Sequence, residues 1–464
     1  MENPPLVTVY IPCRNYGRYL SQAVDSVFAQ LYDHWELFLI NEASDDDTLR
    51  ICNAYAARDP DRVTVIDNAT PLGLQRGANT VLQRCNGVYI MRLDADDWLD
   101  ECALLLMAAK LSSDTKLGIV YGNYFYTDQA GTVLGMERRH ELGTEDSAGH
   151  LPPHGACTMV RTRALKAVGG YTESINAQDG WELWYKVKQY MGSANLNVPV
   201  FYYRQHETSL SRDADRLLTA RSKIFQGLSK KLEGSYALSH LAVLGVKESY
   251  PDLPGIPYRT LDGVPLLERA LGMMGGSKSL TTVMVSSKRD EVLAFAEGLE
   301  ARGAVPAHMR RKRDTFENGE YLPVQQILED AGAAYIDQHG HPPDLISFHS
   351  LHTFNCTAAH IDSSVDILRV GKSDSVISVQ EEKSALFSYG TDGLRILNPG
   401  RLDGLTYDRE RVYRFNGAII TTWWDMVAAG HFLGVNIGYL EMSPRDSQHI
   451  TKDILDSPAV LATT

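Results

Sequence analysis

Short apolar runs alternate with amphipathic stretches along the first two hundred residues. Four runs rich in β-branched and aliphatic residues predict buried strands at 6–12, 35–40, 63–67 and 88–93. Three stretches with apolar residues on one helical face predict helices at 19–30, 49–60 and 77–85. Strands that alternate with helices predict a largely parallel sheet with right-handed crossovers.

The alternation stops and then restarts in the second half. Residues 213–237 read as helices that leave the first domain, and the strand–loop–helix order resumes at 240–246. A chain of 464 residues is too long for one ordinary core. We therefore predict an α/β protein with two Rossmann-like domains, at 1–212 and 238–464, joined by a helical linker at 213–237.

Composition and charge exclude several classes of protein. A net charge of −13 argues against a nucleic-acid binder that relies on phosphate neutralisation. The N-terminus has no basic region followed by an apolar core, and no apolar run reaches the length of a membrane span. The six cysteines contain no CxxC pair, which favours reduced thiols. We expect a soluble cytoplasmic protein.

Candidate chemistry appears where the predicted strands end. Asp94, Asp96 and Asp97 follow the strand at 88–93, and the polar segment 41–47 follows the strand at 35–40. Since ligands bind at the carboxyl ends of parallel strands, both acidic clusters should meet over one crevice. Clustered carboxylates can share a hard divalent cation and its bound phosphates. The alternative is an Asp-rich turn that caps a helix beginning near Trp98.

Six segments in order resemble the family-2 glycosyltransferases, which have the GT-A fold. The resemblance runs from about Val7 to Arg212 and rests on "VYIPCRNYGRYLSQAVDSVFAQ", "LFLINEASDDDT", "PLGLQRGANTVLQRCNGVYIMRLDADD", "HGACTMVRTRALKAVGGYTES", "QDGWELWYK" and "YRQHETSLSR". It implies that Asp96 and His206 bind Mn²⁺ or Mg²⁺. It also implies a set of nucleotide-binding residues: Pro12, Arg14, Asn15, Asn41, Glu42 and Asp94. Because the family usually has two acids where this chain has Asn41 and Glu42, the donor base is left open.

The resemblance also places the catalytic base. Asp179 aligns with the residue that takes the proton from the acceptor hydroxyl as that oxygen attacks the anomeric carbon, so that one displacement inverts the anomeric centre. The alternative is an N-cap for the helix that follows, and both roles can coexist. Donor or acceptor pocket residues implied in the same way are His154, Gly155, Trp181 and Arg204.

The segment 238–458 resembles the acylneuraminate (CMP-sugar) cytidylyltransferases in the order of its elements. The glycine-rich, doubly basic loop of that family is missing, and so are its two late metal carboxylates, which in this chain are His449 and Thr451. The remaining candidates are Lys247, Arg259, His349 and Asn416. One interpretation is a retired enzyme kept for assembly or for binding a sugar or nucleotide. The other is an active variant in which His349, His352 and His449 bind a softer metal, although ordinary packing positions also explain these histidines.

The sequence therefore predicts an inverting, metal-dependent glycosyltransferase. Its partners would be a nucleotide-diphosphate sugar donor and a glycan or other hydroxyl acceptor, with a homo-oligomer allowed through the C-terminal domain. A role in bacterial surface glycan synthesis is an analogy. Two alternatives remain: a bifunctional enzyme that also makes a CMP-activated sugar, and a non-catalytic glycan-binding scaffold. The donor, the acceptor and the oligomeric state are left undetermined.

Overall fold

The chain divides into two compact units, and each is described by itself. The computed structural model describes residues 4–137, 155–175, 177, 179–206, 214–232, 238–313, 323–391, 393–398 and 412–456. One unit contains residues 1–144, 150–224 and 384–410, and the other contains 145–149, 225–383 and 411–464. The division falls within a helix, and the segment 384–410 groups with the first unit. In the described part of the chain, no helix has the length and apolar character needed to cross a membrane.

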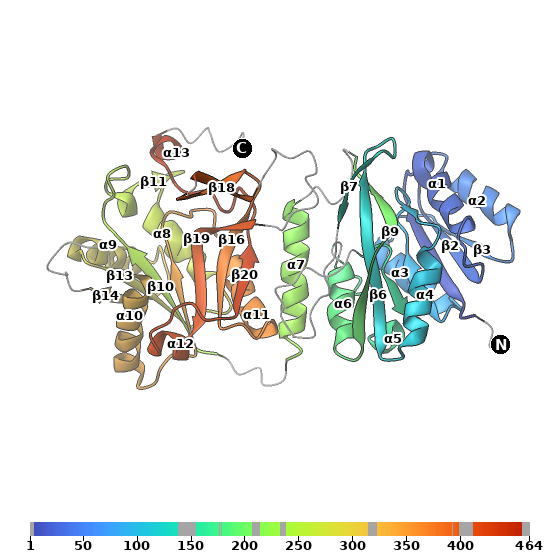
Figure 1. Ribbon diagram of the computed structural model, residues 1–464. Coiled ribbons are helices and arrows are strands. Elements are labelled where there is room, and N and C mark those ends of the chain that lie inside the picture. The colour runs from blue at the N-terminus through green and yellow to red at the C-terminus, as the bar shows by residue number, and fades with distance from the viewer. Residues whose placement is uncertain are drawn as a thin grey trace. The chain divides into compact units, whose positions relative to one another are not determined.

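The first unit is an α/β structure in which helices cover a β-sheet of mixed strand direction (Figure 1). Its strands are β1 (Val7–Cys13), β2 (Trp35–Glu42), β3 (Val63–Asn68), β4 (Tyr89–Arg92), β5 (Trp98–Leu99), β6 (Leu117–Thr127), β7 (Val133–Glu137), β8 (Met159–Arg161) and β9 (Gly192–Arg204). Its helices are α1 (Gly17–Phe28), α2 (Thr48–Arg58), α3 (Leu74–Arg84), α4 (Ala103–Ser113), α5 (Thr162–Ala167), α6 (Asp179–Lys188) and the first part of α7 (Ala214–Ser229). The strands and helices predicted for the first hundred residues are confirmed.

The sheet has the strand order β3-β2-β1-β4-β8-β6-β9-β5, with β7 paired to β6. Strands β1 to β4 are parallel, with Tyr10 opposite both Phe38 and Arg92. Strand β8 then runs antiparallel to β4 and β6. The chain reverses its direction of winding between β1 and β4, so their carboxyl ends form a switch point of the kind where α/β sheets bind ligands.

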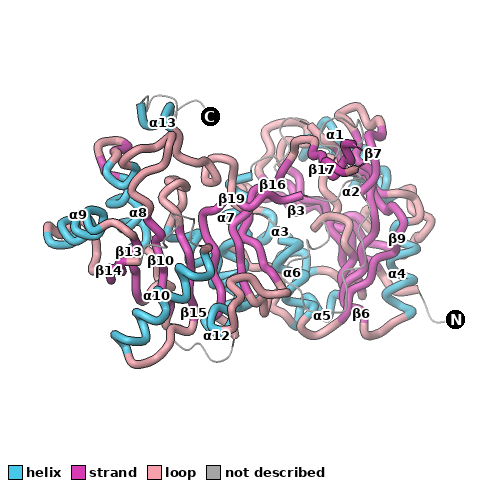
Figure 2. Tube along the Cα trace, turned by 60° about the vertical axis from the view of Figure 1, so that its left-hand side comes forward, coloured by secondary structure: helices cyan, strands magenta, loops and turns pink. Residues whose placement is uncertain are grey.

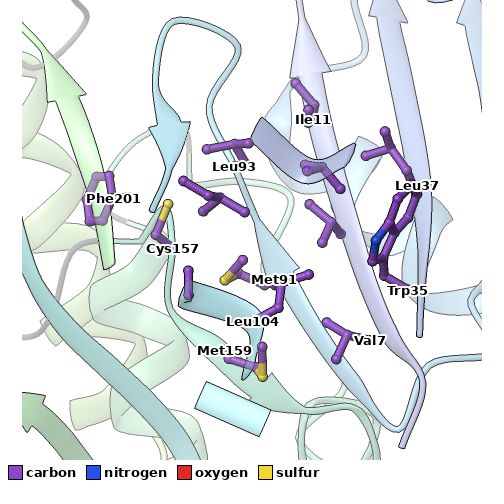
Figure 3. Close-up of a cluster of buried hydrophobic side chains, with 14 of the residues drawn as sticks. Val7, Ile11, Trp35, Leu37, Met91, Leu93, Leu104, Cys157, Met159 and Phe201 are labelled. Carbon is purple, nitrogen blue, oxygen red and sulfur yellow. The ribbon is translucent and has the colours of Figure 1, made fainter. Parts of the chain in front are cut away.

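Alternate residues of β1 face opposite layers, because successive side chains of a strand point to opposite faces. Val7, Val9 and Ile11 pack in one buried cluster with residues of α1, α2 and α4 (Figure 3). Tyr10 packs in another with residues of α3, α5 and α6. Both faces of the sheet are thus buried, which explains why this strand reads as a continuous apolar run.

The second unit also combines helices with a β-sheet of mixed strand direction (Figure 2). Its main strands are β10 (His240–Val246), β13 (Thr282–Ser287), β14 (Met309–Lys312), β15 (Leu345–His349), β16 (Ser375–Glu382), β19 (Val412–Trp423) and β20 (Ile437–Glu441). Its helices are α8 (Leu266–Gly275), α9 (Asp290–Ala301), α10 (Val324–His339), α11 (Ala358–Val370), α12 (Trp424–Ala428) and α13 (Lys452–Asp456). A small hairpin of this unit, β11 (Thr260–Leu261) with β12 (Val264–Pro265), stands apart from the sheet, and the segment 384–410, which groups with the first unit, forms the hairpin of β17 (Leu386–Gly390) and β18 (Gly393–Asn398).

The two large sheets share one topology. The second has the order β14-β13-β10-β15-β19-β16-β20. If β5 and β7 are set aside and the strands of each sheet are numbered along the chain, both read 3-2-1-4-6-5-7. The directions also agree, since the first four strands are parallel and the sixth is antiparallel to both of its neighbours. The α/β class is confirmed for both halves, while the cytidylyltransferase-like character of the second remains a prediction.

Candidate active site

The three carboxylates that follow β4 have different surroundings. Asp94 forms an ion pair with Arg92, with 2.9 Å between Oδ1 and Nε. Asp96 Oδ2 lies 2.8 Å from Nε2 of His206. Asp97 is 1% exposed; its Oδ1 accepts the main-chain N–H of Arg204 at 2.9 Å, and its Oδ2 has no partner among the described residues. Burial raises the pKa of the Asp97 carboxyl well above its usual range, and the charges of Asp96 and Asp94 raise it further.

The turn that carries these acids does not cap a helix at Trp98. Trp98–Leu99 is the short strand β5, in which Trp98 pairs with Tyr202 of β9, and α4 begins only at Ala103. Asp97 is therefore tied to the strand that ends at Arg204, and the capping alternative is wrong for this residue.

Arg204 holds the acidic turn in place. Its Nε donates to the main-chain oxygen of Asp96 at 2.8 Å, and its two terminal nitrogens donate to Gln129 O at 2.7 Å and Gln22 Oε1 at 2.6 Å. Its guanidinium also stacks 4.7 Å from the rings of Tyr19 and Trp98. Because these contacts occupy Nε and both terminal nitrogens, the geometry supports a positioning role better than the predicted pocket contact.

Asp94, Asp96 and Asp97, at the carboxyl end of β4, are called the acidic edge below. His206, two residues after the end of β9, lies against it. Its ring stacks on Tyr19 with 5.6 Å between centroids and meets Tyr16 edge-on at 6.4 Å. Burial raises the pKa of Tyr16, and the charges of Asp96 and Asp94 add to the effect, so this phenol stays neutral beside the carboxylates. The structure thus brings together Asp96 and His206, which are 110 residues apart in the chain.

The loops after β1 and β2 are bound to each other. Asn15 donates its main-chain N–H to Ser44 Oγ, and its Oδ1 accepts from Asp45 N, both at 3.0 Å. Asn41 donates to Asp67 at 2.7 Å. Glu42 is 6% exposed and accepts from Asn68 Nδ2 and from two main-chain N–H groups just before α3. Asn41 and Glu42 therefore tie the end of β2 to β3 and to the start of α3, and their predicted contact with a base remains a prediction.

Three residues near the ends of β1, β2 and β4 have a left-handed backbone conformation. Asn15, Ala43 and Cys157 have φ of 58°, 51° and 56°, in the left-handed region that favours glycine. Asn15 and Ala43 follow β1 and β2, and the N–H of Cys157 donates to the main-chain oxygen of Arg92 in β4 at 2.7 Å. Three of the six non-glycine residues with positive φ in the described part of the chain thus lie next to the ends of β1, β2 and β4.

The predicted base stands at the start of α6. Asp179 is the first residue of that helix, and its side chain lies outside the described residues, as do His154 and Gln178. Gly155 lies just before Cys157. Trp181 is 7% exposed and lies under the guanidinium of Arg221, 4.7 Å from its ring centroid. Their predicted pocket roles remain predictions.

A buried polar network fixes the segment that leads to α6. Glu182 accepts from Thr172 through both its main-chain N–H and its hydroxyl, and it pairs with Lys186 at 2.7 Å. Lys186 Nζ also donates to Gly170 O at 3.0 Å. Gly170 itself has φ of 70°, and a Cβ there would lie 2.5 Å from Oδ1 of Asn79, so this turn requires glycine. These contacts bind the turn at Gly170–Thr172 to α6, the helix that begins at Asp179.

The acidic edge suits a divalent cation that arrives with a diphosphate. No group of three or more histidine, cysteine or acidic side chains able to hold a metal exists among the described residues. Mg²⁺ and similar ions, however, often use one or two carboxylates with phosphate oxygens and water as the remaining ligands. Asp96 and His206 offer such a partial set, and the Asp97 carboxyl, with its raised pKa and its Oδ2 without a partner among the described residues, follows Asp96 directly.

The candidates of the second unit are mostly engaged in internal contacts. His349 is 2% exposed, and its Nε2 lies 2.8 Å from Ser347 Oγ. Asn416 bonds Ser378 at 2.5 Å and Ser447 at 2.9 Å. Arg259 pairs with Asp456 at 2.7 Å, while Lys247 Nζ lies over the ring of Tyr250.

The sequence reasoning missed several residues that surround the acids. They are Tyr16, Tyr19, Gln22 and Arg92. The segment "RNYGRYLSQ" contains two aromatic residues at a helix start, but nothing in it identifies the histidine that they contact.

Comparisons with known proteins agree on one family. Residues 8–169 match the model described as glycosyl transferase family 2. The chain is 40% identical over 213 residues to the putative glycosyltransferase EpsE of Bacillus subtilis, covering 45% of this chain and 76% of that protein. It is 28% identical over 195 residues to the chondroitin synthase of Escherichia coli, covering 41% of this chain and only 27% of that protein. A structure of S. aureus TarS 1-349 in complex with UDP-GlcNAc is 17% identical, with a TM-score of 0.39 over 49% of this chain and 68% of that one, a likeness too weak to support an argument.

Proposed function

Because the chain belongs to glycosyltransferase family 2, we propose that its first unit transfers a sugar from a nucleotide-diphosphate donor to a hydroxyl of a glycan or other acceptor. The similarity to a chondroitin synthase supports a polysaccharide as the acceptor. The observation that carries the proposal is the meeting of Asp96 and His206 at the switch point of the sheet, 2.8 Å apart.

The donor diphosphate would lie at this acidic edge together with Mn²⁺ or Mg²⁺. Asp96 and His206 would hold the ion, and Asp94 would lie beside the nucleotide. The ion would offset the charge that develops on the departing diphosphate. Arg204 would keep Asp96 in place through its main-chain oxygen, and the loops that carry Asn15 and Asn41 would flank the base.

Asp179 would act as the general base. It would take the proton of the acceptor hydroxyl while that oxygen attacks the anomeric carbon and the bond to the diphosphate oxygen breaks. The diphosphate leaves with the electron pair of that bond, and the anomeric centre inverts in the single displacement. For the second unit we propose a structural or ligand-binding role, because His449 and Thr451 stand where the cytidylyltransferases that it resembles have two metal-binding carboxylates.

The test begins with calorimetric titration of UDP, GDP, TDP, CDP and CMP into the full chain with Mn²⁺, for the unaltered protein and for Asp96→Ala. We expect one nucleoside diphosphate to bind only with the ion and only with Asp96 intact. Sugar donors carrying that base are then tested for turnover, and Asp179→Asn should lower kcat by at least a hundredfold. Proton NMR of the product anomeric centre reports inversion.

Two outcomes would contradict the proposal. Metal-independent binding that survives Asp96→Ala would place the nucleotide elsewhere. Unchanged turnover in Asp179→Asn would remove the base from its role. A CTP-dependent release of pyrophosphate by the unaltered chain would instead favour a bifunctional enzyme.

A further inference from the structure

We propose that the second unit binds a phosphate-bearing small molecule directly through cationic side chains, without a divalent cation, at the strand ends that correspond to the acidic edge of the first unit. The inference rests on the ligand-binding role proposed for this unit. It does not depend on sugar transfer by the first.

The shared topology identifies the place. In the order 3-2-1-4-6-5-7, β10 corresponds to β1 and β15 corresponds to β4. The switch point of the second sheet therefore lies between the carboxyl ends of β10 and β15. These ends are followed by Lys247 and by Ser350, so the residues around 247–250 and 349–352 stand where the first unit has its base-side loop and its acids.

A buried arginine lies beside this switch point. Arg313, the residue after β14, is 9% exposed, and its Nη2 donates to the main-chain oxygen of Val246, the last residue of β10, at 3.2 Å. Its Nε has no hydrogen-bond partner among the described residues. The nearby acid Asp330 makes its hydrogen bonds to Arg311 instead, at 2.9 Å and 3.1 Å from Nε. A guanidinium stays charged, and a buried charge without a counter-ion is costly, so an anion is the natural partner for Arg313.

Further cationic and aromatic groups continue from this point. Lys247 Nζ lies 4.8 Å from the ring centroid of Tyr250, and Tyr250 meets His352 edge-on at 4.5 Å. His352 and His449 have ring centroids 6.4 Å apart. Arg313 and Lys247 carry the positive charge of this set, which together with Tyr250, His352 and His449 we call the basic edge. Burial lowers the pKa of His352, so its imidazole adds hydrogen-bonding groups and no charge.

The charges of the two switch points are opposite. After β4 the first unit has Asp94, Asp96 and Asp97, whereas after β15 the second has the sequence Ser-Leu-His. The acid that adjoins the basic edge, Glu248, pairs with Arg289 at 3.1 Å. A divalent cation would be repelled here, while an anion would be attracted without one.

Phosphate is the anion that this geometry fits best. Arginine binds phosphate oxygens through its planar fork, and lysine adds a point charge. Since Arg313 is recessed, a small ligand can reach it more easily than the backbone of a nucleic acid. Ser350, bonded to His352 at 3.1 Å, also lines a small cavity of about 20 Å³ with Thr353 and Arg269.

The experiment is calorimetric titration of the full chain in EDTA with inorganic pyrophosphate, glucose 1-phosphate, AMP, GMP, CMP and UMP. Citrate serves as a phosphate-free polyanion. Lys247→Gln and Arg313→Gln test the basic edge. Arg302→Gln, which alters an exposed arginine just after α9, is the matched control. Asp96→Asn separates this site from the donor site.

We expect at least one phosphate compound to bind saturably in EDTA. Lys247→Gln and Arg313→Gln should each weaken that binding at least tenfold, while Arg302→Gln and Asp96→Asn leave it unchanged. Which probe binds distinguishes a nucleotide from a sugar phosphate or free pyrophosphate. If Arg313→Gln fails to fold, as judged by circular dichroism, the phosphate affinity of Lys247→Gln, which alters an exposed side chain, tests the proposal.

Four results would overturn the proposal: no saturable binding of any phosphate probe, binding that survives Lys247→Gln, binding that is lost in Asp96→Asn, or equal binding of citrate. Sugar transfer is measured in the same Lys247→Gln protein. Transfer that continues while phosphate binding is lost supports two separate sites. Failure of transfer in the unaltered chain would count against the proposed function and leave the phosphate result to be judged alone.

Discussion

Replacing Glu182 by glutamine should destabilise the first unit and slow catalysis. The side chains of Glu182 and Lys186 are 6% and 10% exposed, and their charged groups are 2.7 Å apart. Removing one partner of a buried ion pair typically costs 3–5 kcal/mol, because the other charge is left without compensation. Lys186 would keep Gly170 O and Thr172 Oγ1 as acceptors, at 3.0 Å and 2.9 Å. We therefore expect the lower end of that range, about 3 kcal/mol.

The effect on catalysis follows from the path of the chain. The network holds Gly170 and Thr172 in the segment that ends at Asp179, so a looser segment should misplace the proposed base. We expect kcat to fall about tenfold while the affinity for the nucleotide–Mn²⁺ complex stays unchanged, because no residue of the acidic edge is altered.

Denaturant titration followed by amide hydrogen exchange of α6 measures the stability of this unit separately from the other. The matched control is Asp47→Asn, which breaks an exposed pair with Arg50 whose side chains are 69% and 70% exposed, so its loss should leave the stability nearly unchanged. In the double variant Glu182→Gln/Lys186→Met no buried charge remains, so most of the lost stability should return. Equal losses in Glu182→Gln and Asp47→Asn would refute the reasoning.

Three further predictions concern other buried ionisable side chains. Asp97→Asn should stabilise the metal-free protein above about pH 4, where the unfolded carboxyl ionises, because the folded state raises the pKa of this group; the gain should grow with pH and vanish below pH 4 in EDTA melts. Arg204→Lys should lower stability by about 3 kcal/mol in urea titrations and weaken binding of nucleotide with Mn²⁺, since its contacts to Gln129 and Gln22 would be lost; unchanged binding would rule out a positioning role. The second unit should lose about 2 kcal/mol between pH 7 and pH 5 for each of His240 and His349, because burial lowers their pKa values to about 4 and about 3 and only the unfolded chain takes up protons below about pH 6.5. Hydrogen exchange of β10 at both pH values measures this loss, which His240→Gln should reduce.

The local patterns of the chain predicted the layers of the fold well. Strand β1 is apolar on both faces because helices cover both, and its run of apolar residues is visible in the sequence. The acidic segment after β4 could be placed at the edge of the sheet, because strand ends in parallel sheets share an edge.

What the sequence hid depends on contacts between distant segments. Trp98 looks like the start of a helix, but its pairing with Tyr202 makes it a strand. Asp96 and His206 are 110 residues apart, and only a resemblance to a known family brought them together before the structure did. Glu42 reads as a ligand contact by position, yet it satisfies main-chain N–H groups before α3. Propensity and periodicity carry no information about such long-range partners.

The left-handed backbone at Asn15, Ala43 and Cys157 bears on how this enzyme can be engineered. Each such residue costs of order 1 kcal/mol that glycine would not. Selection for heat resistance alone would therefore favour glycine at Ala43, where no side-chain function would be lost. The same change would widen the conformations open to the loop after β2, whose Ser44 accepts the main-chain N–H of Asn15 in the loop after β1. Thermal tolerance and preorganisation of the candidate site thus compete at these positions, and variants chosen only by melting temperature would drift toward a looser candidate site.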